Sequence, residues 1–134
     1  MVRKCPFCNN KDSVIASNSY AYVIHDKHPY VEGHLLVIPK KHFESIMEMD
    51  DKSLLGTMKL VREMEKRLVE RLHVQGITVR QNWAPFLPEN HLVVRHVHFH
   101  LIPRLLNDGL FYKVKRISLS PHKKASLIKK LQLK

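Results

Sequence analysis

Three histidines, at positions 96, 98 and 100, alternate with apolar residues in the segment His96-Val97-His98-Phe99-His100. Side chains alternate across a strand, so this spacing predicts a strand with all three imidazoles on one face and the apolar side chains on the other. A row of imidazoles on a half-buried strand is costly unless each ring has a hydrogen-bond partner or binds a metal. The pattern therefore favours a chemical site over a chance cluster of histidines on a solvent face or a surface metal site.

Neighbouring imidazoles suit the transfer of phosphoryl and nucleotidyl groups, because they can divide the work between them. One ring nitrogen can attack as a nucleophile while a neighbour holds the tautomer of that ring through its other nitrogen. A third imidazole can donate a proton or a hydrogen bond to a phosphoryl oxygen. Such transfers depend mainly on positioning and on hydrogen-bond donors around the phosphorus, which histidine supplies near neutral pH.

The stretches around this segment predict an α+β fold, in which one long helix packs on an antiparallel sheet of about five strands. Short apolar or alternating runs bounded by turn residues predict the strands, and Pro103 is expected to end the last of them. The predicted strands are residues 14–17, 20–24, 34–38, 77–82 and 93–102, and residues 111–117 are a further candidate edge strand.

Residues 51–72 give the clearest helix prediction, because apolar residues recur there at spacings of three, four and seven. Asp50 or Asp51 can cap the start of this helix, and Gly76 follows its end. We interpret the apolar stripe as packing in the core or in a dimer interface rather than as a ligand site. The stripe consists of Leu54, Met58, Val61, Leu68 and Leu72.

The formal net charge of +11 is concentrated near the end of the chain. No acidic residue follows Asp108, and residues 113–134 carry eight of the eleven excess positive charges. We therefore divide the chain into a domain of residues 1–112 and a basic tail of residues 113–134, whose last part predicts either a short basic helix or disorder. A nucleic-acid partner would bind through this tail, whose alternative role is that of a solvated, flexible end.

The cysteine content and the apolar runs indicate the compartment. Cys5 and Cys8 are too few and too close together for the disulfide framework of a secreted protein. The first residues lack the apolar run of a signal peptide, and no stretch approaches the roughly 18 to 20 apolar residues that span a bilayer. We expect a cytoplasmic or nuclear protein with no membrane partner.

The segment from His96 to Ile102 resembles the signature of the histidine-triad (HIT) family, in which single apolar residues separate three histidines and two more apolar residues follow. Residues 32–42, from Glu32 to His42, resemble the family's other landmark, and the resemblance covers about residues 5–104. It implies a HIT-like fold, commonly a homodimer, and hydrolysis or transfer at the phosphate of a purine nucleotide by chemistry that requires no metal.

The resemblance also implies roles for particular residues. His98 matches the nucleophile that forms a covalent nucleotidyl-histidine, and His100 matches the histidine that contacts the phosphate and helps the leaving group depart. His34 and His96 match supporting imidazoles that fix the tautomer of the nucleophile, and Asn82 matches a phosphate-site asparagine by its place. The expected substrates are purine nucleoside phosphoramidates or dinucleoside polyphosphates, which would release a nucleoside monophosphate. The cations considered for attracting such an anion are Lys40, Arg80 and Arg104.

The loop before the triad departs from the family pattern of small Gly, Gln or Ser residues. Residues 83–93 contain no glycine, two prolines stiffen them, and Leu92 and Val93 lie where polar phosphate contacts are expected. Trp83 and Phe86 can stack on a base or simply pack against the protein. An alternative function is therefore a nucleotide-binding HIT protein with little turnover.

Cys5 and Cys8 form a CxxC pair, which by itself fits a redox pair or buried thiols as well as a metal site. Structural zinc takes four ligands, usually cysteines and histidines. The resemblance suggests His42 and His96 as the other two, because several bacterial-type members of the family use these positions with an N-terminal CxxC. Such a zinc ion would clip residues 1–12 to the sheet. A rival hypothesis, a zinc-stabilised nucleic-acid-binding module, rests on the CxxC pair and the basic tail and leaves the three aligned histidines unexplained.

Overall fold

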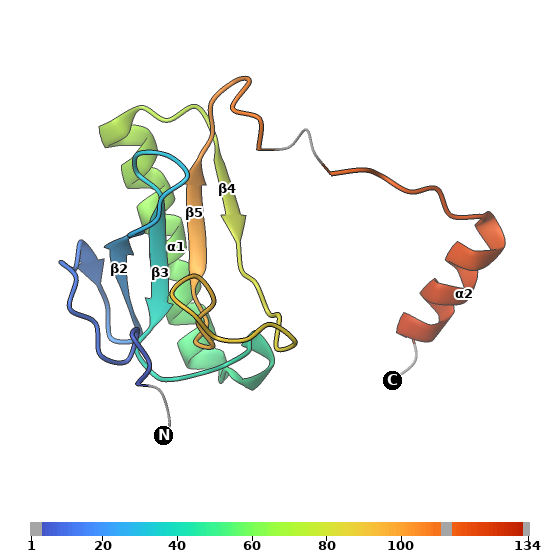
Figure 1. The fold of residues 1–134 in the computed structure, drawn as a ribbon, viewed down its shortest axis with the longest axis horizontal. Helices are drawn as coiled ribbons and strands as arrows, with labels where there is room; N and C mark the ends of the chain where they lie inside the picture. The colour runs from blue at the N-terminus through green and yellow to red at the C-terminus, as the bar shows by residue number, and fades with distance from the viewer. Residues whose placement is uncertain (1–3, 111–113, 133–134) are drawn as a thin grey trace.

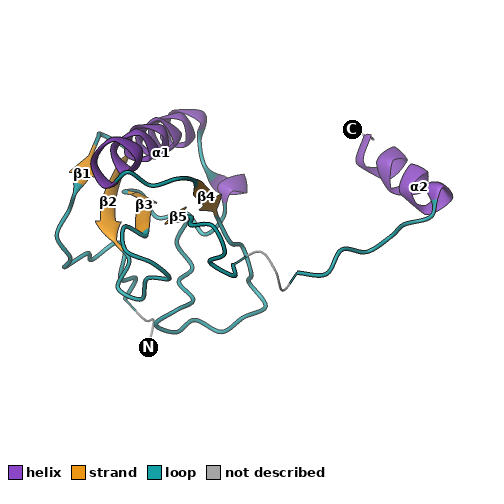
Figure 2. Cartoon of the chain, turned by 90° about the horizontal axis from the view of Figure 1, so that it is seen from above, coloured by secondary structure: helices purple, strands orange, loops and turns teal. Residues whose placement is uncertain are grey.

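The computed structural model describes residues 4–110 and 114–132. The five strands of this part of the chain form one antiparallel sheet in the order β1-β2-β3-β5-β4. Figure 1 shows the long helix α1 lying behind this sheet, and Figure 2 shows α1 on one side of the strands and most loops on the other. The predicted α+β class, sheet and long helix are confirmed. The elements are β1 Ala16–Ser17, β2 Ala21–His25, β3 Leu35–Pro39, the 3-10 helix η1 Ile46–Glu48, α1 Asp51–Leu72, β4 Ile77–Arg80, β5 Phe99–Pro103 and α2 Pro121–Gln132.

Helix α1 has the predicted bounds, and Asp50 is its N-cap, with a side-chain oxygen accepting a hydrogen bond from the Ser53 backbone N–H at 3.1 Å. The helix ends at Leu72, and its C-cap His73 has the left-handed conformation with φ of 54°, so His73 and not Gly76 makes the C-terminal turn. The buried face also differs from the predicted stripe: Met58 and Leu72 are exposed. Val61 and Leu68 of the predicted stripe are buried and Leu54 packs against the core, whereas small and polar residues complete the buried face. The buried residues are Ser53, Gly56, Thr57, Leu60, Val61, Met64 and Leu68.

The strand that carries the triad is shorter than the predicted range of residues 93–102, because residues 93–98 do not join the sheet. The neighbouring strand β3 ends at Pro39, whose carbonyl accepts a hydrogen bond from the His96 ring at 2.7 Å instead of from a backbone N–H. The predicted alternation nevertheless holds, since Val97, Phe99 and Leu101 are buried in the core between the sheet and α1. The histidines between them therefore project to the opposite face.

The other strands differ from prediction by only one or two residues at their ends. Of the candidate edge strand 111–117, residues 111–113 lie outside the described part, and residues 114–117 form no strand. The expected boundary between residues 112 and 113 also lies outside the described part. Helix α2 has no buried residue, and Figure 1 shows it set apart from the sheet.

None of the helices within residues 4–110 and 114–132 is both long and apolar enough to cross a membrane.

A second apolar cluster lies on the sheet face opposite α1. It consists of Tyr22 and Ile24 from β2 and Leu36 and Ile38 from β3, with Phe7 of the N-terminal turn packed against it. The Tyr22 hydroxyl donates a hydrogen bond to the carbonyl of Phe7 at 2.5 Å, which fixes the turn on the sheet. This face therefore brings the cysteine-containing turn beside the strand of the triad.

Candidate active site

A cross-strand row of residues crosses this open face of the sheet. Ile24 lies opposite Leu36, Leu36 lies opposite His100, and His100 lies opposite Arg80. Residues directly opposite one another in antiparallel strands project to the same face. The row therefore passes from apolar residues on β2 and β3, over an imidazole on β5, to a guanidinium at the end of β4.

His98 has its tautomer fixed by a main-chain group. Its Nδ1 lies 2.7 Å from the His96 carbonyl oxygen, and because a carbonyl only accepts, Nδ1 carries the proton and Nε2 keeps its lone pair. Burial lowers the pKa of His98 below its ordinary value, which favours the neutral, nucleophilic ring. The support that we expected from the rings of His34 and His96 comes here from the main chain of His96.

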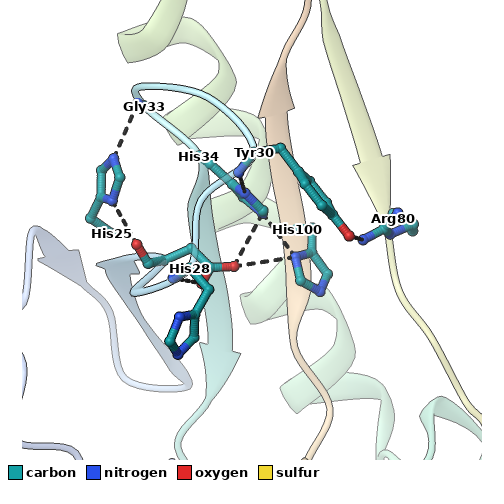
Figure 3. A network of polar contacts seen from close by, with 8 residues as sticks. His25, His28, Tyr30, Gly33, His34, Arg80 and His100 are labelled. Atoms are coloured by element: carbon teal, nitrogen blue, oxygen red, sulfur yellow. Dashed lines mark hydrogen bonds and ion pairs between the residues drawn. The ribbon is translucent and has the colours of Figure 1, made fainter. Parts of the chain in front are cut away.

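His34 supports His100 in this structure (Figure 3). The Tyr30 backbone N–H donates to His34 Nδ1 at 3.1 Å, so the proton of His34 is on Nε2, which lies 2.9 Å from His100 Nδ1. Because His34 donates to Nδ1 of His100, the remaining proton of a neutral His100 is on its Nε2. Burial, followed by the nearby charges of His98 and Arg80, lowers the pKa of His100 to about 3.

Asp26 is the acidic partner of these two imidazoles, and the sequence did not single it out. Its Oδ2 lies 3.3 Å from His34 Nε2 and 3.7 Å from His100 Nδ1. The carboxylate favours the protonated form of each ring, whereas burial disfavours it more strongly, and the pKa of His34 is lowered overall. Both histidines are therefore held as neutral hydrogen-bonding groups.

Arg80 is the one of the three candidate cations that lines the histidine cleft. Its Nη2 donates to the Tyr30 hydroxyl at 3.1 Å, and its guanidinium lies 5.2 Å from the centre of the Tyr30 ring. Lys40 is exposed and does not line the cleft. Arg104 is bound by the carboxylate of Asp108 through two contacts of 2.6 Å.

The histidines open into a cleft of about 710 Å³, whose lining includes Asn82, Trp83, Phe86, His98 and His100. A second cavity, of about 460 Å³, adjoins the cleft over β2 and β3; we call it the apolar cavity after Phe7, Ile24 and Leu36, and charged residues such as Lys4, Lys11 and Asp12 also line it. The two share part of their lining, so they form one continuous recess. The shared residues are Phe7, Asp26, His28, Leu36, His91 and Val94.

The unusual loop of residues 83–93 is held by its own hydrogen bonds. The Asn90 side-chain oxygen accepts from the backbone N–H groups of Leu92 at 2.7 Å and Val93 at 2.9 Å. Arg95, a residue that the sequence did not single out, donates to two carbonyls of the loop, at 2.9 and 3.1 Å. The backbone N–H groups of Leu92 and Val93, the two residues at the place where polar phosphate contacts are expected, are therefore engaged within the loop. Trp83 and Phe86 are exposed and form an aromatic wall of the cleft.

The four residues expected to bind zinc lie together behind the triad. Nδ1 of His96 lies 3.1 Å from Nδ1 of His42 and 3.4 Å from Sγ of Cys5, and Sγ of Cys8 lies 3.3 Å from Nδ1 of His42. His96 donates its Nε2–H to the Pro39 carbonyl, which leaves the lone pair of Nδ1 directed at the cluster. This is the usual arrangement of a metal-binding histidine, whose second nitrogen bonds a carbonyl.

Comparison with known proteins identifies the family. The family model for the HIT domain matches residues 8–106. The chain belongs to the HIT domain family. This HIT protein is 32% identical over 118 residues to an uncharacterized HIT-like protein of Mycoplasma pneumoniae, a match covering 84% of this chain and 80% of that one.

Two further relatives carry functional names. This HIT protein is 35% identical over 105 residues to an adenosine 5′-monophosphoramidase of Saccharomyces cerevisiae. The match covers 75% of this chain and 62% of the yeast protein. Its structure is similar to that of a histidine triad nucleotide-binding protein from Candida albicans, with a TM-score of 0.79 and 27% identity over 96% of this chain and 95% of that one. The HIT-like fold predicted from the sequence is thereby confirmed.

Proposed function

We propose that this HIT protein hydrolyses a purine nucleotide conjugate at its α-phosphate and releases a nucleoside monophosphate through a covalent intermediate on His98. The observation that carries the proposal is the hydrogen bond from His98 Nδ1 to the His96 carbonyl. It leaves Nε2 unprotonated in a cleft that His100, two residues further along the chain, also lines and where its Nε2–H can act as a hydrogen-bond donor. The yeast relative named as an adenosine 5′-monophosphoramidase supports the same chemistry.

The reaction proceeds in two displacements. Nε2 of His98 attacks the α-phosphorus, a P–N bond forms, and the bond to the leaving group breaks while the Nε2–H of neutral His100 donates a hydrogen bond to the leaving atom, which takes any proton that it needs from solvent. Water then attacks the same phosphorus, the P–N bond breaks, and His98 is regenerated with release of the monophosphate. His34 acts as a positioning residue, because its hydrogen bond sets which nitrogen of His100 carries the proton. Asn82 lines the cleft and is proposed to contact the phosphate.

The apolar cavity is the proposed place of the nucleoside. Phe7, Ile24 and Leu36 give it a flat apolar floor on which a purine base can lie. Asp26 stands where this cavity meets the histidine cleft, so its carboxylate can accept hydrogen bonds from ribose hydroxyls. A base, a ribose and an α-phosphate thus lie in the order in which the row of side chains crosses the sheet.

The cluster of Cys5, Cys8, His42 and His96 is the proposed structural zinc site. Zinc bonds of about 2.0 to 2.3 Å in a tetrahedron place ligand atoms roughly 3.3 to 3.8 Å apart, close to the 3.1 to 3.6 Å found between these donors. Four protein donors leave no open position, so the ion would be structural. By fixing the N-terminal turn, it would hold Phe7 against His98.

The test measures release of AMP from an adenosine phosphoramidate and from diadenosine tetraphosphate. We expect release by the wild type, its loss in His98→Ala, and normal rates in the matched control His122→Ala, which removes an exposed histidine of α2. Quenching by denaturation at alkaline pH during turnover, where the acid-labile P–N bond survives, should trap a protein heavier by one AMP unit, which is absent in His98→Ala. A wild type that binds AMP but turns over neither substrate would contradict the enzymatic proposal and leave the nucleotide-binding alternative.

A nucleic-acid partner is the second proposal, and it rests on α2. All the described residues of this helix are exposed, and it carries four lysines and no acidic residue. If the tail binds nucleic acid, affinity should fall steeply with salt and should be lost from a chain of residues 1–112. Affinity that is unchanged by the truncation would exclude the tail as the binding element.

We also propose that the protein is a homodimer. The outer surface of α1 carries several exposed apolar side chains, which a second copy can cover. Sedimentation equilibrium tests this directly, and a monomer at micromolar concentration would contradict it. The exposed apolar residues of the helix are Leu55, Met58, Val69 and Leu72.

A further inference from the structure

Arg80 lies at the opposite end of the cross-strand row from the apolar cavity. The cavity lies over β2 and β3, His100 is on β5, and Arg80 is on β4, one strand spacing of about 4.8 Å further along. A substrate with its nucleoside in the cavity and its α-phosphate at the histidines would therefore direct its leaving group toward Arg80. Arg80 lines the cleft on the side that the leaving group would occupy.

The charge of Arg80 has no acidic partner among the described residues. The one hydrogen bond found for its side chain there goes to the Tyr30 hydroxyl, and its buried Nε has no hydrogen-bond partner in that part of the chain. Arg80 as a whole is half-buried, but a buried nitrogen such as its Nε is costly to leave without a hydrogen-bond partner unless it serves a ligand. Arg104, which is close in sequence to the triad, shows the contrasting arrangement, because Asp108 holds it with two contacts.

Tyr30 holds the guanidinium beside the reacting histidines (Figure 3). The ring of Tyr30 stacks on His34 with 5.3 Å between ring centres and 14° between planes, and its backbone N–H bonds the same imidazole. Its hydroxyl then accepts the hydrogen bond from Arg80. Tyr30 thus links Arg80 to His34, which places the guanidinium beside the histidine cleft.

We propose that Arg80, positioned by Tyr30, binds a phosphate of the leaving group, so that the site prefers substrates whose α-phosphate is joined to another phosphate over those that release an uncharged amine. The proposal rests on the proposed hydrolysis at the α-phosphate. Guanidinium groups bind phosphate through paired, charge-assisted hydrogen bonds, which neutral leaving groups cannot form.

The bond changes explain why the preference should appear in the rate. His98 Nε2 forms a bond to the α-phosphorus, and the bond from that phosphorus to the bridging oxygen breaks. The electron pair of the broken bond goes to the bridging oxygen, which departs as an anionic oxygen of the leaving phosphate while the Nε2–H of His100 donates a hydrogen bond to it. Because negative charge grows on the leaving phosphate as the bond breaks, Arg80 stabilises the transition state more than the bound substrate.

The experiment compares kcat/KM for diadenosine tetraphosphate and for an adenosine phosphoramidate with an uncharged amine. In Arg80→Met we expect the ratio of the two values to fall about 10- to 100-fold, the effect of losing a charge-assisted pair of hydrogen bonds. Arg80→Lys should restore part of the ratio, and Tyr30→Phe should shift it in the same direction by less. Arg67→Met, which removes the same charge from the far side of α1, should leave the ratio unchanged.

Other results would overturn the proposal. An equal loss on both substrates in Arg80→Met and Arg80→Lys would mean that Arg80 acts on the histidines rather than on the leaving group. A loss confined to a third substrate, a phosphoramidate whose amine carries a carboxylate, would replace phosphate by carboxylate as the ligand.

A separate measurement distinguishes this proposal from the proposed hydrolysis. If the wild type releases AMP from none of the substrates, hydrolysis fails, and calorimetry then compares the binding of ADP and AMP. The subsite predicts tighter binding of ADP that Arg80→Met removes. Equal affinity for ADP and AMP in the wild type would refute the subsite as well.

Discussion

Replacement of Phe7 by alanine should raise the pKa of His98 and move the acid limb of the rate profile. The Phe7 ring lies edge-on to His98 with 5.0 Å between ring centres, and it also contacts His96 at 5.8 Å. Burial is the main cause of the low pKa of His98, so exposing the ring should bring that pKa upward, toward its ordinary value of about 6.5. A protonated Nε2 cannot attack, so the variant should lose more activity near pH 6 than near pH 8.

The same change should also lower stability. Truncating a fully buried phenylalanine costs about 3 to 5 kcal/mol, and the half-buried Phe7 should cost about 2 kcal/mol. An unfolding entropy of about 2.1 cal/mol/K per residue over this chain converts that loss into a decrease in Tm of about 7 °C. Phe7→Leu keeps an apolar cover over His98 and should lose about 1 kcal/mol or less.

The assay is kcat/KM between pH 4.5 and 8.5 for the wild type, Phe7→Ala and Phe7→Leu, with the metal content of each preparation measured in parallel. The acid limb should lie at higher pH in Phe7→Ala and close to the wild-type position in Phe7→Leu. A decrease in Tm with an unmoved acid limb, at equal metal content, would refute the idea that Phe7 controls the ionisation of His98.

Three further changes test other parts of the fold. Gly33→Ala should lower the free energy of unfolding by about 1 to 3 kcal/mol, because Gly33 has φ of +83° and an added Cβ would lie 3.1 Å from Leu72 and 3.3 Å from Pro103; an unchanged urea midpoint would contradict this. The free energy of unfolding should decrease as the pH falls from about 6.5 toward 3, because burial lowers the pKa of His100 to about 3 and the unfolded chain therefore binds more protons in that range. Urea titrations at several pH values measure the slope of the free energy of unfolding against pH. The slope should be smaller in His100→Gln, because this change removes the contribution of His100. Deletion of residues 111–134 should change Tm by less than about 2 °C, because α2 buries no residue; a larger decrease in calorimetry would show that the tail packs on the body.

The sequence predicted those features that depend on local periodicity. The alternation around His98 correctly assigned the two faces of the triad segment, and the spacing of apolar residues with Asp50 gave the bounds of α1. The ligands predicted for a metal ion also lie close enough to bind the same ion, with their donor atoms within 4.8 Å of one another. They are Cys5, Cys8, His42 and His96. That juxtaposition followed from the family resemblance, since nothing in the local pattern links residues so far apart in the chain.

The features that the sequence missed depend on contacts between distant segments. Asp26 and Tyr30 lie in a loop whose pattern shows only turn residues, and their function depends on how that loop folds over His34. The length of β5 could not be predicted, because a side chain, the ring of His96, competes for the Pro39 carbonyl that a ladder would otherwise use. Arg80 was one of three equivalent cations in the sequence, and only the register of β4 against β5 sets it apart.

In the proposed binding mode, each strand in the row from Ile24 to Arg80 contributes a different part of substrate recognition. Strand β4 is the last in the sheet order, and among the described strands it pairs only with β5. Its side chains can therefore change during evolution with little effect on the segment that carries His98 and His100. Substitutions at a single terminal strand would then diversify the compounds that related proteins accept, while the catalytic centre is inherited unaltered.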